Sequence, residues 1–275
     1  MSFNTNHGKK FLFKANACAN LAVQLWSRVR EPFRSFADVG WAARAAFQAA
    51  RHSPEYQAVY DIKAPLVTIC VTTFNRSGLL TERCLKSLIN QDYKNLQIVV
   101  VGDCCTDDTA ERIAALNEPR IEFVNLSERG VYPSEPRQRW MVAGTDAVNH
   151  ALALARGQFI THLDDDDEHA PHRVSTLLAL MRETRADILW HPFDYERVPG
   201  EWHVNHAPKF AVNNVSTSSV FYHHWLRAVP WDINAWRYAE PGDWNRFRKL
   251  RYLGARAARA PERLLKHYRE RNQDC

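Results

Sequence analysis

Four consecutive aspartates, Asp164 to Asp167, end the apolar run in the stretch FITHLDDDDEHAP, residues 159–171. Carboxylates this close repel one another and raise one another's pKa, at a cost of roughly 1 kcal/mol or more for each close pair. A bound cation would offset that cost. Because Mg²⁺ and Mn²⁺ favour one or two protein carboxylates together with substrate phosphate oxygens, the run predicts a divalent-cation site for a ligand that carries phosphate.

The side chains of an extended segment alternate in direction, so Asp164 and Asp166 are expected to point one way and Asp165 and Asp167 the other. One alternate pair would then face the ligand, while another member of the run caps a helix that begins near Pro171. The competing interpretation is a solvated acidic turn that only caps this helix.

The common glycine-rich phosphate loops are missing, since neither GxGxxG nor GxxxxGK[ST] occurs in the sequence. Guanidinium groups are an alternative because they make bidentate contacts to phosphate. The segment SERGVYPSEPRQRW, residues 127–140, supplies Arg129, Arg137 and Arg139. Ordinary surface charge is the competing interpretation of these three arginines.

Alternating buried strands and helices must position these side chains. The β-branched and apolar runs predict strands over 66–74, 96–102, 121–126 and 157–163. Helices are expected between them: one with Leu80, Cys84 and Leu88 on one face, one over 106–116 opened by a capping threonine, and one over 144–155. This order predicts an α/β fold with a mostly parallel sheet, which binds ligands at the carboxyl ends of its strands. The segments TTFNR, GDCCTDD and DDDD stand at those ends.

Composition is that of a globular protein: 275 residues, 45% hydrophobic and 24% charged. No apolar run has the roughly 18 to 20 residues of a membrane span, and no secretory signal is visible. The six cysteines show no CxxC spacing, so we expect reduced thiols in a cytoplasmic protein. Residues 1–60 hold eight Lys or Arg and three Asp or Glu, which leaves the remaining chain neutral and argues against nucleic acid as a ligand.

Three regions are expected: a basic helical arm with a linker over 1–64, an α/β half over 65–184, and a second half over 185–275 with a mixed or antiparallel extension of the sheet. Two amphipathic stripes fill the arm, one of them formed by Phe36, Val39, Ala43 and Phe47. The arm either packs on the domain or on a partner subunit, or anchors the protein at an anionic membrane surface. The segment 52–65 resembles a linker.

Residues 65–183 resemble the nucleotide-sugar-binding half of family 2 glycosyltransferases, which have the GT-A fold. The resemblance is carried by PLVTICVTTFNRSGLLTERCLKSLINQDYKNLQIVVVGDCCTDDT and by ALALARGQFITHLDDDDEHAPHRV, in this order and with the family's spacing. It implies an inverting, metal-dependent enzyme that moves a sugar from a nucleoside diphosphate to an acceptor hydroxyl. The expected cofactor is Mn²⁺ or Mg²⁺, and the expected partners are a nucleotide-sugar donor, most simply UDP-linked, and a saccharide or glycolipid acceptor.

The resemblance also assigns roles to residues. Asp164 and Asp166 match the metal-binding DxD motif, with His267 as a further candidate ligand. The resemblance places Thr73, Asn75 and Asp103 at the nucleotide. Asp165 is a further binding candidate, and Arg137 and Arg139 are diphosphate candidates taken from the arginine segment itself, since none of its arginines aligns with a family position. The second loop reads Gly102, Asp103, Cys104, Cys105 where the family usually has D-D-G-S, so the ribose contacts differ.

The catalytic base of this family is a carboxylate near the start of a helix in the second half. Asp243, in YAEPGDWNRFRKL, matches that position, and Glu240 is the reserve candidate. An N-terminal helix cap is the alternative role of Asp243. His162, His169 and His172 are expected to be packing or surface residues, and NNVSTSSVFYHH, with tryptophans 202, 225, 231 and 236 around it, is expected on the acceptor side.

Synthesis of a cell-surface polysaccharide or glycoconjugate is the role that the resemblance implies, in the cytoplasm or at the inner face of the membrane. A sugar nucleotidyltransferase is an alternative, although such enzymes usually have the glycine-rich opening loop that is missing here. A non-catalytic subunit that binds sugar nucleotides is another.

Overall fold

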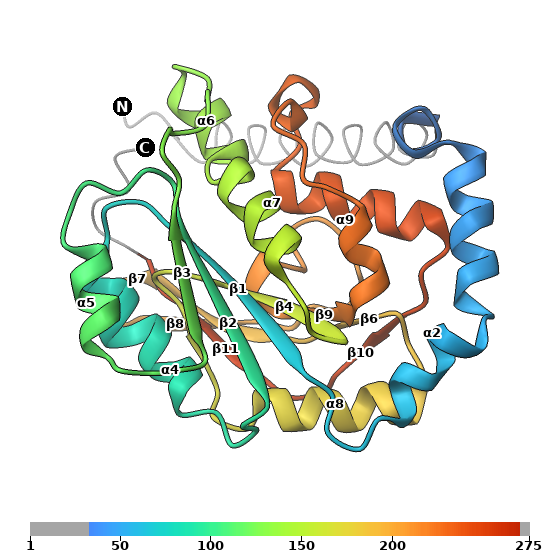
Figure 1. The fold of residues 1–275 in the computed structure, drawn as a ribbon. Coiled ribbons are helices and arrows are strands. Elements are labelled where there is room, and N and C mark those ends of the chain that lie inside the picture. Colours follow the sequence, from blue (N-terminus) through green and yellow to red (C-terminus); the bar gives the residue numbers. More distant parts are fainter. Residues whose placement is uncertain (1–32, 270–275) are drawn as a thin grey trace, which may run out of the picture.

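The computed structural model describes residues 33–269, which form two sheets, the larger of them flanked by helices (Figure 1). The larger sheet has seven strands in the order β10-β6-β9-β4-β1-β2-β3, and the smaller has four in the order β5-β11-β7-β8. The strands of the larger sheet are β1 (Val67–Thr73), β2 (Leu96–Gly102), β3 (Ile121–Asn125), β4 (Phe159–Asp164), β6 (Ile188–Trp190), β9 (Val220–His223) and β10 (Ala257–Arg259). Those of the smaller sheet are β5 (Glu168–His169), β7 (Phe193–Val198), β8 (Glu201–Asn205) and β11 (Leu265–His267).

The expected mostly parallel sheet is confirmed, because β1 pairs in parallel with β2 and β4, and β2 with β3. β9 runs antiparallel between β4 and β6, which makes the sheet mixed at that side. Strands β1 and β2 are buried along almost their whole length, as their apolar composition predicts. The chain adds β2 and β3 on one side of β1 and then returns to add β4 on the other, and such a reversal opens a crevice at the carboxyl ends of β1 and β4.

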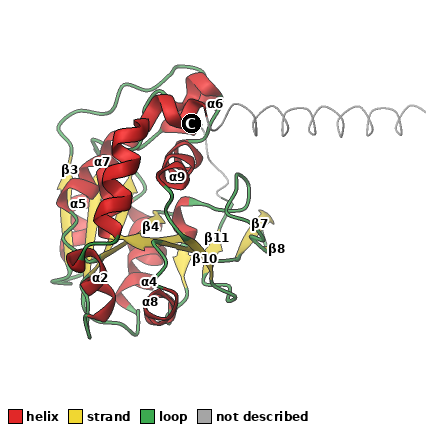
Figure 2. Ribbon diagram, turned by 90° about the vertical axis from the view of Figure 1, so that its right-hand side faces the viewer, coloured by secondary structure: helices red, strands yellow, loops and turns green. Residues whose placement is uncertain are grey.

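Helices cover both sides of the larger sheet. Helices α7 and α9 lie on one side and α8 on the other (Figure 2). The helical segments after β1 are α3 (Ser77–Leu79), η2 (Leu80–Leu85), α4 (Lys86–Ile89), α5 (Thr109–Ala115), α6 (Pro136–Val142), α7 (Thr145–Leu154), α8 (Arg173–Thr184), η3 (Thr217–Ser219), η4 (His224–Ala228), η5 (Ala235–Tyr238) and α9 (Gly242–Leu253).

Two expected helix caps are wrong. Helix α5 begins at Thr109, and Asp107, not a threonine, accepts the hydrogen bond from the Thr109 N–H. Helix α8 begins at Arg173, and its N-cap residue His172 makes no side-chain cap. No aspartate of the acidic run caps α8, because the short strand β5 separates the run from the helix.

The segment expected to be a linker is folded into the domain. It forms α2 (Pro54–Ala58) and η1 (Val59–Asp61), and Tyr56, Val59 and Tyr60 are buried in the hydrophobic core. Their burial explains why the segment 52–65 contains aromatic and aliphatic residues.

The part of the arm within the described residues, 33–51, is helical and bends at Gly40, whose φ of 76° is a left-handed conformation that favours glycine. Of the predicted stripe, Phe47 is fully buried and Val39 packs against the core, so this part of the arm packs on the domain. Phe36 and Ala43 are exposed. The first predicted stripe, residues 18–29, lies outside the described residues.

Four cysteines of the described residues (70, 84, 104 and 105) are free thiols, in agreement with the expected reduced state. None of the described helices combines the length and hydrophobicity that a bilayer crossing requires.

Candidate active site

A cavity of about 1250 Å³ opens at the carboxyl ends of β1 and β4. Its wall also includes the start of α9, the end of α6, residues 212–217 and the segment after β11. The residues singled out from the sequence that line it are Thr73, Asn75, Asp103, Arg129, Arg139, Asp164, Asp165, Asp166, Asp243 and His267. Most of the predicted site therefore meets in one cavity, although it comes from segments up to about 190 residues apart.

The acidic run forms a turn, because the Asp167 N–H donates to the Asp164 carbonyl over 3.1 Å as β4 ends. The predicted alternation of side chains is therefore wrong. Asp165 and Asp166 both pair with Arg76, at 3.1 and 2.8 Å.

The other two aspartates meet His267. Asp164, Asp167 and His267 each offer one ligand atom, and these three atoms lie within 4.8 Å of one another. His267 reaches the site because β11 pairs with both β5 and β7. Two carboxylates and an imidazole are donors that fit Mn²⁺ and, less well, Mg²⁺. Asp166 was predicted as the likelier direct ligand of the DxD pair, but it pairs with Arg76, and Asp167 is the residue that lies beside Asp164 and His267.

Burial and mutual repulsion raise the pKa of Asp164 to about 8, with Asp167 and Asp166 as the charged neighbours. Burial also raises the pKa of Asp165, to about 6, although Arg76 opposes the shift. Burial alone would lower the pKa of His267, but the hydrogen bond to Asp167 (Nδ1 to Oδ2, 2.8 Å) and the nearby carboxylates raise it to about 9. The site thus holds more negative charge than its own cations neutralise, which is the condition for binding a further cation.

Arg76 was not assigned from the sequence, although it belongs to the quoted TTFNR segment. It follows β1 directly and lies at the same edge of the sheet as the acidic run, so its position after the strand was the available signal. Arg83 also reaches this corner, where its guanidinium donates to the Asp166 carbonyl over 2.7 Å.

The loops after β1 and β2 are tied together by Asn75. Its Oδ1 accepts from the Thr106 N–H at 2.8 Å, and its φ of 51° is a left-handed conformation that asparagine tolerates. Thr73 is buried at the end of β1, beside Gly102 of β2. These contacts fix the floor of the cavity next to Asp103.

Asp103 is 2% exposed and accepts hydrogen bonds from Tyr132 Oη (2.9 Å) and the Gly130 N–H (3.3 Å). Arg129 Nε lies 3.5 Å from the same carboxylate, and its guanidinium stacks on Phe74, 3.5 Å from the ring centroid. Segment 127–132 therefore folds over Asp103.

The predicted diphosphate arginines are not equivalent. Arg139 lines the cavity and donates to the Ser134 carbonyl over 3.0 Å. Arg137 is exposed and is not part of the cavity wall.

Asp243 lies in the first turn of α9 and lines the cavity. The N-cap of this helix is Pro241, so the alternative role of Asp243 as the N-cap is wrong. Its Oδ1 accepts from the Trp244 N–H over 2.6 Å, but burial outweighs that bond and raises the pKa of Asp243 to about 6.

Glu240, the reserve base, is placed outside the cavity wall. Its carboxylate is bound by Arg34, Arg248 and Asn245.

The flanking histidines are packing and surface residues, as expected: His162 and His169 are buried, and His172 is exposed and pairs with Glu262. On the expected acceptor side, residues 213 and 215–217 and Trp231 line the cavity. Trp225 packs on Phe47. Trp202 packs on Tyr268.

Comparison with known proteins agrees with this geometry. The family model for glycosyl transferase family 2 matches residues 68–225. Among curated relatives, the putative colanic acid biosynthesis glycosyl transferase WcaA of Escherichia coli (strain K12) is 34% identical over 134 residues, 48% of this chain and 43% of the relative. The GalNAc(5)-diNAcBac-PP-undecaprenol beta-1,3-glucosyltransferase of Campylobacter jejuni is 35% identical over 127 residues, 45% of this chain and 37% of the relative. The chain thus spans less than half the length of these two relatives.

Solved structures show the same fold. TarS 1–349 of S. aureus superposes with a TM-score of 0.57 and 20% identity, covering 74% of this chain and 60% of that chain. The mannosyltransferase PcManGT of Pyrobaculum calidifontis, in complex with GDP-Man and Mn²⁺, gives a TM-score of 0.54 and 19% identity, covering 84% of this chain and 69% of that chain.

Proposed function

The chain belongs to glycosyltransferase family 2, and from this membership we propose that it transfers a sugar from a nucleoside-diphosphate sugar to an acceptor hydroxyl in polysaccharide or glycoconjugate synthesis. One observation carries the proposal. Asp164 and His267, which form a cluster with the fully buried Asp167, line the same cavity as the carboxylate of Asp243, and its volume of about 1250 Å³ suits a donor together with an acceptor.

Asp243 is the proposed general base. Its pKa of about 6 leaves it mainly ionised at neutral pH while still basic enough to accept the proton of an attacking hydroxyl. Attack on the anomeric carbon from the side opposite the diphosphate inverts its configuration, so we assign an inverting mechanism. Glu240 is not proposed as the base, because two arginines occupy its carboxylate.

Asp164, Asp167 and His267 are the residues proposed to hold Mn²⁺ or Mg²⁺, with Asp166 within reach if Arg76 releases it. A bound dication neutralises the charge that develops on the leaving diphosphate. Arg76 then gains a second role, since a guanidinium freed from Asp166 can bind a phosphate oxygen.

A UDP-linked donor is proposed on two grounds. Asp103 is buried beside the cavity, where a carboxylate can accept the imide N–H of uracil. In addition, TarS of S. aureus was solved in complex with UDP and with UDP-GlcNAc. The complex of PcManGT with GDP-Man makes GDP-linked sugars the competing donors.

A thermal-shift panel of UDP- and GDP-sugars, with Mn²⁺ or with EDTA, tests the donor and the metal together. We expect a rise in melting temperature with UDP-sugars that requires the metal. A rise of equal size in EDTA would contradict the metal site, and a rise with GDP-sugars alone would contradict the assigned nucleotide.

The variant Asp243→Asn separates the enzyme from its alternatives. It should keep donor binding and lower transfer by about 10³-fold, the range expected for loss of a general base. A non-catalytic binding subunit would show no transfer in the wild type. A nucleotidyltransferase would release pyrophosphate from a nucleoside triphosphate and a sugar phosphate, which a coupled phosphate assay detects.

Peripheral contact with an anionic membrane is proposed for the arm, where Phe33 (75% exposed) and Trp41 (71%) are exposed and the sequence carries a surplus of positive charge. Deleting residues 1–60 would be a poor test, because Phe47, Tyr56 and Tyr60 belong to the core. The double variant Phe33→Ser/Trp41→Ser leaves the core intact, and it should reduce co-sedimentation with vesicles that contain phosphatidylglycerol. Unchanged co-sedimentation would favour packing on a partner subunit.

A further inference from the structure

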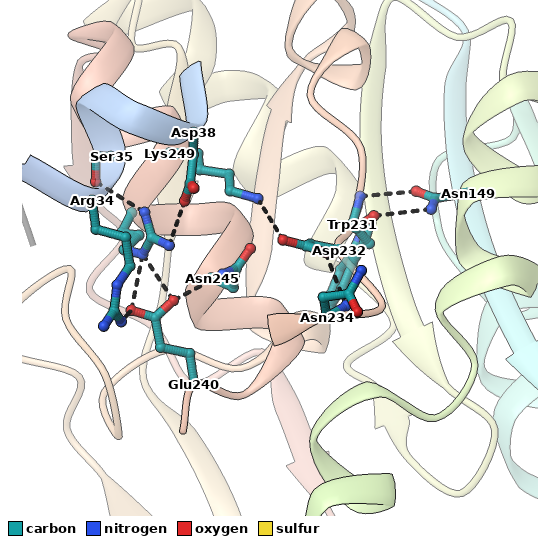
Figure 3. A network of polar contacts seen from close by, with 11 residues as sticks. Arg34, Ser35, Asp38, Asn149, Trp231, Asp232, Asn234, Glu240, Asn245 and Lys249 are labelled. Atoms are coloured by element: carbon teal, nitrogen blue, oxygen red, sulfur yellow. Dashed lines mark hydrogen bonds and ion pairs between the residues drawn. The ribbon is translucent and has the colours of Figure 1, made fainter. Parts of the chain in front are cut away.

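A group of charged side chains joins the arm to the helix that carries Asp243. Arg248 of α9 is fully buried, and its Nε donates to both carboxylate oxygens of Glu240, at 3.0 and 2.9 Å. Its two terminal nitrogens reach the arm, at Ser35 Oγ (3.1 Å) and Asp38 Oδ2 (2.6 Å). Arg34 of the arm completes the group through a 2.7 Å bond to Glu240. We call Arg34, Asp38, Glu240 and Arg248 the arm latch (Figure 3).

Glu240 also controls how the chain enters α9. It precedes the helix by two residues, yet its carboxylate accepts from Asn245 Nδ2 (2.8 Å) and from Arg248, five and eight residues further on. The entry segment is thereby held back against the side of the helix. Asp243 lies between these attachment points, so its position in the cavity depends on them.

Close packing leaves this entry little freedom. A Cβ at Gly242 would lie 3.0 Å from the Met141 carbonyl and 3.3 Å from the Trp231 ring, both of which belong to residues of the cavity wall. Trp231 is itself fixed through two backbone hydrogen bonds to Asn149 of α7, and its neighbour Asp232 pairs with Lys249 of α9 at 3.4 Å. Figure 3 shows these contacts running from the arm to α7. A small shift of α9 would therefore move the part of the cavity wall that contains Asp243 and Trp231.

The charges of the arm latch balance, which suits it to hold the arm and α9 in one arrangement. It holds two carboxylates and two guanidinium groups, and Arg248 is fully enclosed. A buried ion pair adds little net stability, but its directional bonds select one arrangement of the elements that it joins. The bend at Gly40 brings the latch residues of the arm, 34–38, over α9, while further along the arm Gln48 donates to the Leu253 carbonyl at the other end of that helix.

We propose that Glu240 is a positioning residue, and that with Arg248 and Asp38 it makes the arm a necessary part of the acceptor-side active site. The proposal rests on the assignment of Asp243 as the base. It gives the arm, which lies outside the family match at residues 68–225, a direct role in the turnover rate.

The experiment compares Glu240→Gln, Asp38→Asn and their double variant with wild type, each checked for a cooperative thermal transition. We expect each single variant to lower kcat by about tenfold, with the affinity for the UDP-sugar and Mn²⁺ unchanged, because misplacing a catalytic group costs rate rather than donor binding. The pH–rate limb that belongs to Asp243 should shift in both. The double variant should be no slower than the slower single variant, since both act through one latch.

Asp61→Asn is the matched control, because Asp61 pairs with Arg185 at an exposed site remote from the cavity and should leave kcat unchanged. If the Asp38 variant fails to fold, Arg34→Ala replaces it, since Arg34 is partly exposed and its loss leaves the pair of Arg248 and Asp38 in place.

Outcomes separate this proposal from the proposed function. If Glu240→Gln and Asp38→Asn kept the wild-type kcat and pH profile while Asp243→Asn was inactive, the positioning role of the latch would be wrong. The proposed function would stand. If Asp243→Asn stayed active, Glu240→Gln were inactive and azide restored activity to Glu240→Ala, then Glu240 would be the base. That result would overturn both the latch and the assignment of Asp243. Additive losses in the double variant would show two independent structural effects and would also overturn the latch.

Discussion

The acidic turn and the arm latch are two groups of charged side chains built on opposite principles. In the turn, four carboxylates meet Arg76 and His267, and Arg83 donates to the Asp166 carbonyl. In the latch, two carboxylates meet two guanidinium groups. Both groups are largely buried, so desolvation acts on both, and the difference lies in the charge that remains.

Burial, together with repulsion from Asp167 and Asp166, raises the pKa of Asp164 to about 8, and a bound cation would relieve this repulsion. A compensated group has no such demand and serves as a rigid joint. Comparing the two teaches that charge balance, more than burial, separates a ligand site from a structural contact in this molecule.

The largest effect is expected from breaking the balance of the latch. Arg248→Met removes a buried cation and leaves Glu240 and Asp38 with one partly exposed arginine, so the free energy of unfolding should fall by about 3 kcal/mol. Urea denaturation followed by circular dichroism measures it. Arg112→Met, which breaks two exposed pairs, is the control and should leave the free energy of unfolding almost unchanged. A loss for Arg248→Met as small as that of the control would show that the latch is not a joint.

The next effect concerns the turn. Asp167→Asn keeps the side-chain volume but removes the carboxylate that touches His267, so the affinity for Mn²⁺ should fall by about 10- to 100-fold. Isothermal titration of Mn²⁺ measures this loss, with the exposed Glu111→Gln of α5 as the control. Equal affinities in Asp167→Asn and the control would leave Asp164 and Asp166 as the metal pair.

Proton competition sharpens the comparison further. Asp164 and His267, with pKa values of about 8 and 9, must lose protons before they bind a metal ion. Loss of the Asp164 proton alone should therefore raise the affinity for Mn²⁺ by about 50-fold from pH 6 to pH 8, and loss of the His267 proton should add to that rise. Titrations in buffers of different ionisation enthalpy should show proton release on binding. A flat pH dependence would mean that neither residue is a ligand.

The last prediction is a gain in the free energy of unfolding. The folded pKa of Asp164, about 8, lies above the value of about 4 for an unfolded aspartate, so ionising it costs folding stability progressively as the pH rises from 4 to 8. Asp164→Asn has no such cost, and in EDTA it should be more stable than wild type at pH 8, with little difference near pH 4. Thermal unfolding at both pH values tests this. Destabilisation at pH 8 would show that the aspartates do not repel.

The parallel part of the sheet was predictable because its buried strands have continuous apolar sequences. β1 and β2 lie within about one residue of the expected limits, and the parallel order follows from the alternation of strands and helices. Antiparallel β9 could not be placed between β4 and β6 in the same way, because strand order depends on contacts between residues about 60 positions apart.

Residue types predicted the site better than side-chain directions did. Three residues of the acidic run (Asp164, Asp165 and Asp166) line one cavity with Asp103, Asp243 and His267, as expected from the strand ends and the family resemblance. The assumption of extended backbone failed at Asp164, where the chain turns, and so Asp167 was missed as the neighbour of His267. The burial of Tyr56 and Tyr60 was missed because their partner Asp187 lies more than 120 residues away.

The contact between the arm and α9 can form only late in the synthesis of this part of the chain, because it needs residues of both. Ser35 and Arg248 are 213 residues apart, so the arm lacks its partner on α9 until the ribosome has added those residues. Phe47 and Arg51 stay without their final neighbours until Asp187 and Trp225 emerge. Since such non-local closures slow folding and leave apolar surface open to aggregation, we expect yield on expression to depend on chaperones and on low temperature.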